Sequence, residues 1–229
     1  MSVTDRRARH RASLRRDILN AASKLFAEEG YEPVTMRRIA ATIEYSPTTI
    51  YIYFKGKREL VDAICDETFS QLAAKLERLT PADRTPMGYL REGLRTYIDF
   101  GLTHQAHYAV TFLQPRKTAA DSRLEGSIGA RAFDGLRQGV AACAASADIK
   151  TTSIDATSQA LWASIHGLTA LLITDKGFPF VNQQVLIDHL LDVLIAGLRS
   201  PSGPTLSLPS QAPTQPRPAQ SSRPFSFMD

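Results

Sequence analysis

The sequence lacks the features that identify several common classes of protein. Its two cysteines, Cys65 and Cys143, lie far apart and outside any CxxC pair, so neither a disulfide framework nor a zinc site is predicted. No apolar run approaches the roughly eighteen residues of a membrane span, and no apolar segment follows the arginine-rich N-terminus as in a secretory signal. The alternating pattern of half-buried strands is also missing. We therefore expect an all-α protein of the cytoplasm.

Motifs for catalysis and metal binding are equally scarce. No P-loop, GxGxxG or nucleophile-elbow pattern occurs in the sequence. His104 and His107 lie near Asp99, but such spacing often arises by chance and no clear further ligand accompanies it. The sequence therefore predicts a protein that is not an enzyme and that holds no metal and no cofactor. A helical enzyme with a small apolar site is an alternative for which the residues offer no support.

Positive charge is concentrated at the N-terminal end of the chain. Residues 1–60 hold 12 Lys and Arg against 7 Asp and Glu, whereas residues 61–229 hold 15 against 16. The first segment therefore carries +5 and the second −1. This distribution is typical of a protein that binds a polyanion through one end, and it also fits a solvated basic arm. Residues 1–13 contain four arginines without apolar periodicity and are predicted to form a disordered arm.

Two short helical patterns separated by a turn lie in residues 35–57, TMRRIAATIEYSPTTIYIYFKGK. The first pattern places apolar side chains on one face, namely Met36, Ile39, Ala40 and Ile43. Thr35 is its predicted N-cap. The second begins with Ser46 as a predicted N-cap and Pro47 at the first helical position, where the missing N–H costs nothing. Ile50 and Phe54 can then dock inward. This arrangement predicts a helix-turn-helix, although packed helical corners show similar patterns.

The rest of the chain favours further helices and then loses its periodicity. Apolar periodicity and helix stop signals predict about nine helices in all, the others covering residues 14–29, 57–79, 87–103, 107–113, 119–146, 153–174 and 183–198. Residues 14–60 form the predicted DNA-binding head and residues 61–199 the body. Residues 200–229 contain seven Pro and seven Ser and are predicted to be a disordered tail, because they cannot bury enough apolar surface to fold.

The first sixty residues resemble the DNA-binding head of the TetR family of transcriptional regulators. The resemblance follows the order and spacing of residues from the first helix into the fourth, which are Ile18, Ala21, Ala22, Leu25, Phe26, Gly30, Tyr31, Thr35, Ile39, Ala40, Ser46, Tyr51, Tyr53, Phe54, Lys57 and Leu60. It covers about a quarter of the chain. It implies a helix-turn-helix head on an all-helical body that binds ligands and dimerises. The leading expectation is thus a ligand-responsive homodimeric repressor.

Resemblance and helix geometry together assign roles in DNA binding. Thr48, Thr49 and Tyr51 are the candidates for contacts with base edges, because threonine can reach base acceptors or pack on a thymine methyl. Phosphate contacts are expected from Thr35, Arg37, Tyr53 and Lys57. Ser46 and Pro47, which begin the second helix of the motif, complete the predicted DNA-binding set. Tyr53 is also compatible with a structural, partly buried role.

The sequence departs from the family pattern in the turn. Glu44 stands where glycine is frequent, and a positive φ at Glu44 would strain the backbone by about 1 kcal/mol. Thr48 stands where glycine often opens the second helix, so its side chain is an additional candidate for a DNA contact. These departures leave the operator sequence open.

The body has more apolar positions than one buried face requires. They predict a dimer surface in residues 153–198, through Leu161, Ile165, Leu168, Leu172, Val185, Leu186, Leu190, Val193, Leu194 and Leu198. A set of aromatic residues and one histidine predicts a pocket for a small apolar or aromatic effector, and equally fits an ordinary core: Tyr89, Tyr97, Phe100, Tyr108, Phe112, Phe133, Trp162 and His166.

An alternative interpretation belongs to another functional class. A helical binding or assembly protein could keep this fold while its head has lost sequence-specific contact with DNA. The +5 charge of residues 1–60 and the intact run from Thr49 to Lys57 argue against it. The expected partners are therefore an operator in double-stranded DNA, a second copy of the chain and a small-molecule effector, with no membrane.

Overall fold

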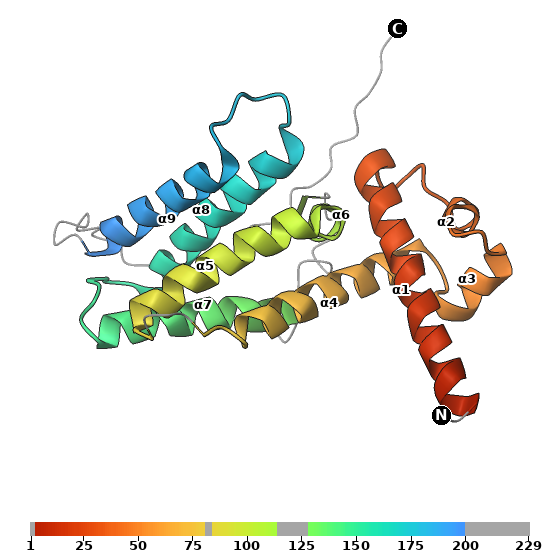
Figure 1. The fold of residues 1–229 in the computed structure, drawn as a ribbon, viewed down its shortest axis with the longest axis horizontal. Helices are drawn as coiled ribbons and strands as arrows, with labels where there is room; N and C mark the ends of the chain where they lie inside the picture. The colour runs from red at the N-terminus through yellow and green to blue at the C-terminus, as the bar shows by residue number, and fades with distance from the viewer. Residues whose placement is uncertain (1–2, 81–83, 114–127, 200–229) are drawn as a thin grey trace, which may run out of the picture.

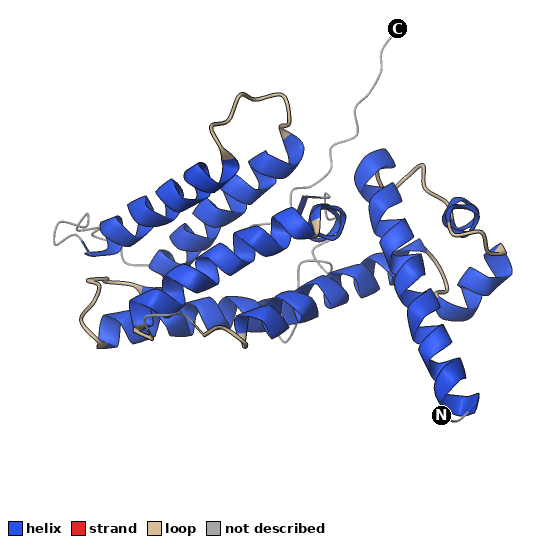
Figure 2. Ribbon diagram, viewed as in Figure 1, coloured by secondary structure: helices blue, strands red, loops and turns tan. Residues whose placement is uncertain are grey.

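The computed structural model describes residues 3–80, 84–113 and 128–199, and within these ranges the chain is helical with connecting turns and no strand (Figure 2). The prediction of an all-α fold is confirmed. The predicted tail and residues 119–127 of a predicted helix lie outside the described residues. The elements are α1 (Val3–Glu29), α2 (Met36–Thr42), α3 (Pro47–Tyr53), α4 (Lys57–Leu76), α5 (Pro86–Thr103), α6 (Gln105–Tyr108), the π-helix η1 (Ala109–Leu113), α7 (Ile128–Ala145), α8 (Ile154–Thr174) and α9 (Gln183–Arg199).

Helices α1, α2 and α3 form a compact head at one end of the molecule (Figure 1). Its core is closed around side chains that are fully buried, among them Ile18, Phe26, Ile39 and Ile50. These residues occupy the apolar faces that the helical periodicity predicts. The head is therefore built as a three-helix unit that holds α3 at its outer edge.

Residues 3–13 of the N-terminal arm are helical, which corrects the prediction of disorder for this part of the chain. Helix α1 begins at Val3 and continues without a break to Glu29. Arginine and alanine are good helix formers, so the segment extends the amphipathic helix behind it even though it has no apolar face of its own. Asp5 lies in the first turn, where a carboxylate interacts favourably with the helix dipole. The arginines of this segment are exposed on a helix.

The turn between α2 and α3 has the geometry of a Schellman motif. The N–H of Tyr45 donates to the carbonyl of Ala40 at 3.0 Å, and the N–H of Glu44 donates to that of Ala41 at 3.2 Å. This motif requires a left-handed backbone conformation at the first residue after the helix cap. That residue is Glu44, whose φ is +59°. The turn therefore places a non-glycine residue in a conformation that costs about 1 kcal/mol.

The N-caps predicted from the sequence are present on both helices of the motif. The Thr35 hydroxyl accepts from the N–H of Arg38 at 3.1 Å. The Ser46 hydroxyl accepts from the N–H of Thr49 at 3.2 Å, and Pro47 occupies the first position of α3. These bonds satisfy N–H groups that a helix start leaves without a partner, so α2 and α3 begin where the sequence predicts.

Helix α4 joins the head to the body and crosses the predicted boundary at residue 60. Its first half contributes Leu60 and Ile64 to the core of the head, and its second half contributes Leu72 to the core of the body. The same continuous helix therefore packs against the head at its start and against the body further along. The core of the head therefore extends through Ile64, and α4 belongs to both cores.

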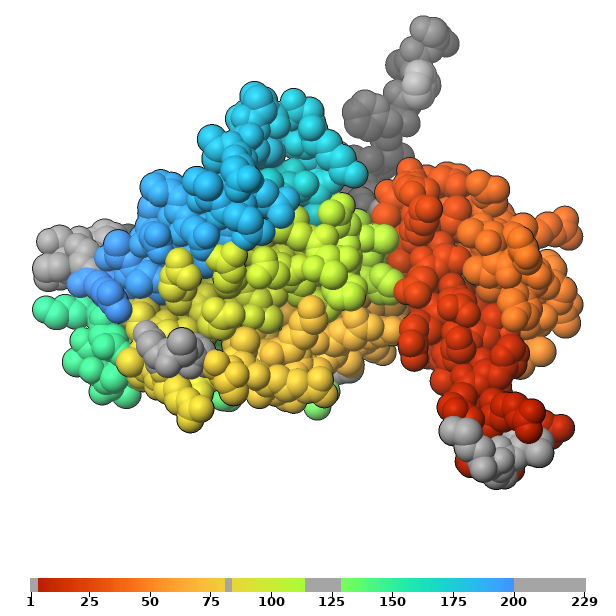
Figure 3. All heavy atoms as spheres, viewed as in Figure 1, coloured from red at the N-terminus to blue at the C-terminus, as the bar shows by residue number. Residues whose placement is uncertain are grey.

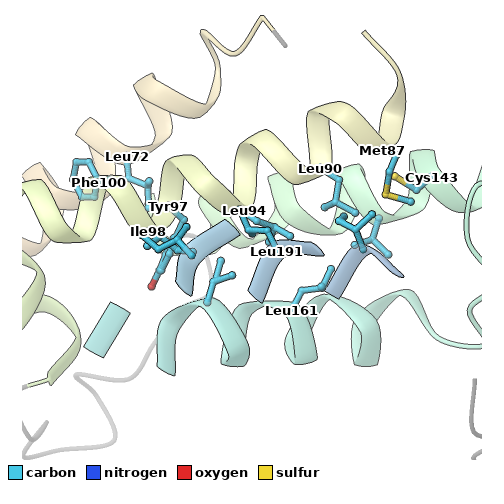
Figure 4. Close-up of a cluster of buried hydrophobic side chains, with 14 of the residues drawn as sticks. Leu72, Met87, Leu90, Leu94, Tyr97, Ile98, Phe100, Cys143, Leu161 and Leu191 are labelled. Atoms are coloured by element: carbon cyan, nitrogen blue, oxygen red, sulfur yellow. The ribbon is translucent and has the colours of Figure 1, made fainter. Parts of the chain in front are cut away.

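The body is arranged around α5, which contacts α4, α7, α8 and α9. Figure 4 shows side chains of this core, including Leu90 and Leu94 of α5 with Leu161 of α8 and Leu191 of α9. Ion pairs on the surface also join α5 to α9, since Arg91 bonds Asp192 at 2.8 Å and Arg95 bonds Asp188. The free Cys143 of α7 is buried in the same core.

The predicted helix over residues 107–113 is instead two short elements, α6 and η1. Tyr108, the last residue of α6, is buried in the core of the body, whereas Val110 of η1 is buried in the core of the head. A π-helical turn is wider than an α-helical one and changes the direction of successive side chains. Figure 3 shows α1 of the head lying against this part of the body. The segment therefore belongs to both cores.

Candidate DNA-binding surface and ligand cavity

Helix α3 presents large side chains to solvent although it is only seven residues long. Ile50 is buried in the head, but Tyr51 is 54% exposed and Ile52 is 70% exposed. Thr48 is exposed as well. A short helix that buries one residue and exposes an aromatic and a β-branched side chain is not serving the core alone. The exposed face of α3 is the candidate base-contacting surface.

The other predicted DNA-binding residues differ in how exposed they are and in the contacts that they make within the head. Thr49 is half-buried, and its hydroxyl lies 2.9 Å from that of Ser46. Tyr53 is half-buried and packs against the core of the head. Arg37 is exposed at the start of α2, as is Thr35, and Pro47 is half-buried.

Lys57 has contacts that the sequence did not suggest. Its ammonium donates to the carbonyls of Tyr31 at 2.8 Å and Glu32 at 3.1 Å, and lies 4.4 Å from the centre of the Tyr31 ring. Two of the three ammonium donors are thus used inside the head. Lys57 fixes the start of α4 against the loop after α1, so it positions the head whether or not it also reaches a phosphate.

Ile52 is the residue that sequence reasoning missed on this surface. It lies between Tyr51 and Tyr53, and the sequence analysis gave it neither an inward nor an outward role. The signal that could have found it is helical spacing, because Ile52 lies four positions after Thr48 and shares its exposed face. Exposed isoleucine next to threonine is suited to contact thymine methyl groups in a major groove.

A cavity of about 700 Å³ lies in the body between α4, α5, η1, α7 and α8. Six of the eight residues predicted for a pocket line it, namely Tyr89, Tyr97, Phe112, Phe133, Trp162 and His166. The other two do not, which corrects the predicted set. Phe100 is buried in the core, where its ring lies 4.6 Å from that of His104. Tyr108 is fully buried behind the wall, where its ring lies 4.7 Å from that of Phe112 and its hydroxyl bonds to His166.

Three polar side chains meet at one side of this cavity. The hydroxyl of Tyr97 lies 3.1 Å from that of Tyr108 and 3.1 Å from Nδ1 of His166, and the Tyr108 hydroxyl lies 2.5 Å from the same nitrogen. Burial raises the pKa of Tyr97 to about 12, raises the pKa of Tyr108 and lowers the pKa of His166. All three groups are therefore uncharged at neutral pH.

The cavity wall also contains residues that the sequence analysis did not single out. Phe69, Leu136 and Gln159 belong to it, and so do glycines of α5 and α7, among them Gly135 and Gly139. A Cβ at Gly135 would have no atom within 4 Å, and one at Gly139 would meet only Leu90 at 3.7 Å. The missing side chains leave part of the space open. Glycines that leave space in a core produce no apolar periodicity, so sequence periodicity does not predict this part of the cavity.

The outer faces of α8 and α9 carry exposed apolar residues. Leu171 is 49% exposed, Val185 60% and Val193 54%. The other exposed positions on these helices include the small residues Ala160, Ala163 and Gly197, and also His189, which lies one turn from both Val185 and Val193. Leu161 and Ile165, which the sequence analysis also assigned to a dimer surface, are instead 2% exposed in the core of their own chain. The unpartnered apolar surface is therefore smaller than predicted.

Asp99 and His104 lie at the end of α5, and His107 lies in α6. Among the residues that the structure describes, no group of three or more His, Cys, Asp or Glu side chains converges on a common point. The same residues include no helix long and apolar enough to cross a membrane.

Comparisons with known proteins place this architecture in a family. The family model described as "Bacterial regulatory proteins, tetR family" matches residues 18–64, and that described as "Tetracyclin repressor-like, C-terminal domain" matches residues 90–198. The chain belongs to the TetR family of helix-turn-helix transcriptional regulators. The residues that carry the resemblance of the head lie within or next to the first match, and the cavity and α9 lie largely within the second.

Individual relatives support the same assignment. The chain is 38% identical over 69 residues to an HTH-type transcriptional repressor of Mycobacterium tuberculosis, which is 30% of this chain and 37% of the relative. It is 35% identical over 72 residues to the transcriptional repressor KstR of the same organism, covering 31% of this chain and 33% of KstR. The chain thus spans about a third of the length of these relatives. Both relatives are transcriptional repressors, and regulation of transcription through DNA binding is the function of the family.

A solved structure extends the likeness to the whole fold. The crystal structure of a tetR-family regulatory protein from Rhodococcus RHA1 superposes with a TM-score of 0.70 over 80% of this chain and 96% of that protein. The two are 19% identical in sequence. The likeness therefore extends from the head to the fold of the body.

Proposed function

We propose that the chain is a homodimeric repressor whose heads bind a two-fold symmetric operator and whose bodies each bind a small molecule that releases the DNA. The observation that supports the DNA contact is the exposure of Tyr51 and Ile52 on α3. These side chains point away from the core on the helix that a helix-turn-helix places in the major groove. Exposed Arg37 and the arginines of α1 add positive charge beside them.

The dimer follows from the need for two heads and from the surface of α8 and α9. One head contacts few base pairs, so useful operator affinity requires two heads about one helical turn apart or a multiple of it. The exposed apolar residues of α8 and α9, together with small neighbours that allow close approach, form a self-complementary surface for a second copy. This surface supports a two-fold dimer through residues 153–198.

Coupling between cavity and DNA is carried by η1 and α4. Phe112 of η1 lines the cavity, and Val110, two residues earlier, is buried in the core of the head. Helix α4 likewise lines the cavity through Leu72 and enters the head through Leu60. A ligand that favours one position of these elements therefore changes the position of the head, and with two heads in a dimer it changes their separation.

Fluorescence anisotropy with the DNA upstream of the protein's own reading frame tests the DNA-binding role. A scrambled sequence serves as the control, and both are titrated across a salt series. We expect tight, salt-dependent binding that prefers the upstream DNA. Tyr51→Ala should reduce this preference, whereas Gln138→Ala, at an exposed position of the body outside the cavity wall, should leave it intact. Equal and weak binding to both DNAs would overturn the proposal and favour a binding protein that acts through its body.

A further inference from the structure

The wall of the body cavity is apolar over most of its area. Rings and leucines from α4, α5, η1, α7 and α8 face the space, among them Phe69, Leu94, Phe112, Phe133 and Trp162. The rings are already packed against one another, since Phe69 meets Phe112 edge to face at 5.3 Å and Phe133 meets Trp162 at 6.2 Å. Binding to such a wall is favoured by the burial of apolar ligand surface, and the wall provides few hydrogen bonds for a molecule that is polar along its length.

Charged groups are almost absent from this wall. Among the described residues that line the cavity none is a Lys or an Arg, and the only carboxylate is that of Glu77. Glu77 follows the end of α4 and is exposed, as is the polar Gln159. An anion bound between the rings would lose its hydration without gaining a cationic partner, which disfavours its entry. The wall therefore selects against carboxylates and phosphates.

The polar cluster at the cavity has one group that can turn to a ligand. Nδ1 of His166 offers a single site, either one proton or one lone pair, so it can make a full hydrogen bond with only one of the two tyrosine hydroxyls at a time. The Tyr108 hydroxyl lies closer to that nitrogen, at 2.5 Å against 3.1 Å for Tyr97. His166 can therefore release the Tyr97 hydroxyl, which keeps its 3.1 Å contact with the Tyr108 hydroxyl and has a hydrogen-bonding site left for a ligand. Tyr97 lines the cavity, whereas Tyr108 does not.

We propose that the cavity binds an uncharged, largely apolar small molecule whose single polar group, a hydroxyl or a carbonyl, hydrogen-bonds to Tyr97. The inference rests on the proposed function, because it names the chemical class of the effector. A hydroxyl or carbonyl suits this site because the Tyr97 hydroxyl can donate or accept. The remaining surface of the ligand packs on the rings and fills the space that the glycines of α7 leave open.

The volume and the opening of the cavity fit such a molecule. Pockets for drug-sized ligands have volumes of about 300–1,000 Å³, and this cavity has about 700 Å³. Tyr89 and Trp162 line it and are each partly exposed to solvent, which places an entrance beside them. A ligand can therefore enter past these rings without unfolding a helix.

The single tryptophan of the chain makes binding directly measurable. Trp162 lines the cavity and stacks on the ring of His166 at 5.4 Å, so a ligand beside it changes its fluorescence. The full-length protein is titrated with four optically clear probes of equal chain length. These are 1-decanol and 2-decanone, which are uncharged, decanoate, which is an anion, and decyltrimethylammonium, which is a cation. We expect the two uncharged probes to bind on the order of tenfold or more tightly than either ion at pH 7.5.

Two variants test the contacts within the cavity. Tyr97→Phe removes only a hydroxyl and should weaken 1-decanol and 2-decanone about threefold to tenfold, without changing the weak affinity for decyltrimethylammonium, which forms no hydrogen bond. Gly139→Leu starts in ordinary contact with Leu90 and extends into the cavity, so it should abolish binding of every probe. Gln138→Leu, at an exposed position of the same helix outside the wall, is the matched control.

The outcomes separate this inference from the proposed function. Tightest binding of decanoate or of decyltrimethylammonium would overturn the uncharged class, and an unchanged affinity in Tyr97→Phe would overturn the polar contact. Failure of all four probes to bind would overturn the ligand class altogether. None of these results alters the anisotropy measured with upstream DNA in the absence of probe, so the DNA-binding role would fail only in that separate assay.

Discussion

The head and the body of this chain are both helical, but they are packed in different ways. The head closes around fully buried residues such as Ile18 and Ile39, and its glycines, Gly30 and Gly56, lie outside its helices. The body surrounds a cavity of about 700 Å³, and Gly135 and Gly139 in the middle of α7 keep part of it open. The head is thus closely packed around its exposed DNA-binding surface, while the body contains a cavity large enough for a small molecule.

This difference matches a division of labour in the family. A surface that must match the spacing of base pairs benefits from a closed core, because close packing holds side chains in single positions. A domain that must respond to a ligand benefits from an incomplete core, because the ligand supplies the missing contacts and shifts the equilibrium between conformations. The two regions meet at Val110, which packs in the core of the head, and along α4, which contributes side chains to both cores.

The largest expected effect comes from separating the two copies of the body. Val193→Arg places a charge on the apolar face of α9 and, in a two-fold interface, buries two unpaired charges. We expect a monomer in analytical ultracentrifugation and a loss of operator affinity on the order of a thousandfold, because each head then binds alone. Gln138→Arg adds the same charge to an exposed position of α7 and should leave the dimer intact. A dimeric Val193→Arg protein would place the interface elsewhere.

The next effect compares the two cores directly. Ile39→Ala, in the closed core of the head, should lower the free energy of unfolding by about 3 kcal/mol. Leu136→Ala, in the wall of the cavity, should cost only about 1 kcal/mol, because Leu136 is half-buried and already borders open space. Urea denaturation followed by circular dichroism measures both. Equal losses would show that the cavity wall is packed as tightly as the head.

A smaller effect is expected at the DNA-binding surface itself. Ile52→Ala should weaken binding to the preferred operator by about 1 kcal/mol per half-site through loss of contact with a thymine methyl. Replacing the thymines of the operator with uracil one at a time removes only that methyl. One replacement should weaken the wild-type protein and leave Ile52→Ala unaffected, as measured by anisotropy. If every replacement weakens both proteins equally, Ile52 has no part in base recognition.

The smallest effect concerns the strained turn of the head. Glu44→Gly relieves the positive φ of +59° and should stabilise the protein by up to about 1 kcal/mol. Ala41→Gly, at an exposed position within α2, should destabilise it by about the same amount, because glycine there gains no relief and weakens the helix. Thermal unfolding of the two variants gives the comparison. If the Glu44→Gly protein is less stable than wild type, the Glu44 side chain contributes more to the free energy of unfolding than its positive φ costs.

Sequence patterns predicted the head better than the body. Apolar periodicity and cap residues located α2 and α3, and the N-caps Thr35 and Ser46 are present as predicted. The helical start of α1 was missed because its arginines and alanines carry no apolar face. The role of Lys57 was missed because its partners lie at Tyr31 and Glu32, and only tertiary folding brings those carbonyls to it.

The cavity was predicted only as a set of aromatic residues, and two of them proved to lie elsewhere. Periodicity states that Phe100 and Tyr108 are buried, but it does not distinguish a buried side chain that fills the core from one that faces a hole. The cavity depends on how α7 packs against distant parts of the chain, since Gly129 lies against Phe69 and Gly139 lies near Leu90. Such complementarity between helices becomes visible only when they are packed together.

The most direct test of the account is the DNA affinity of the full-length protein with and without a filled cavity. The anisotropy of upstream DNA is measured for wild type and for Gly139→Leu while 1-decanol is added, with Trp162 fluorescence recording occupancy. We predict that the alcohol weakens DNA binding by wild type as the Trp162 signal saturates and leaves Gly139→Leu unchanged. An alcohol that fills the wild-type cavity without changing DNA affinity would contradict the coupling between the hollow body and the closed head.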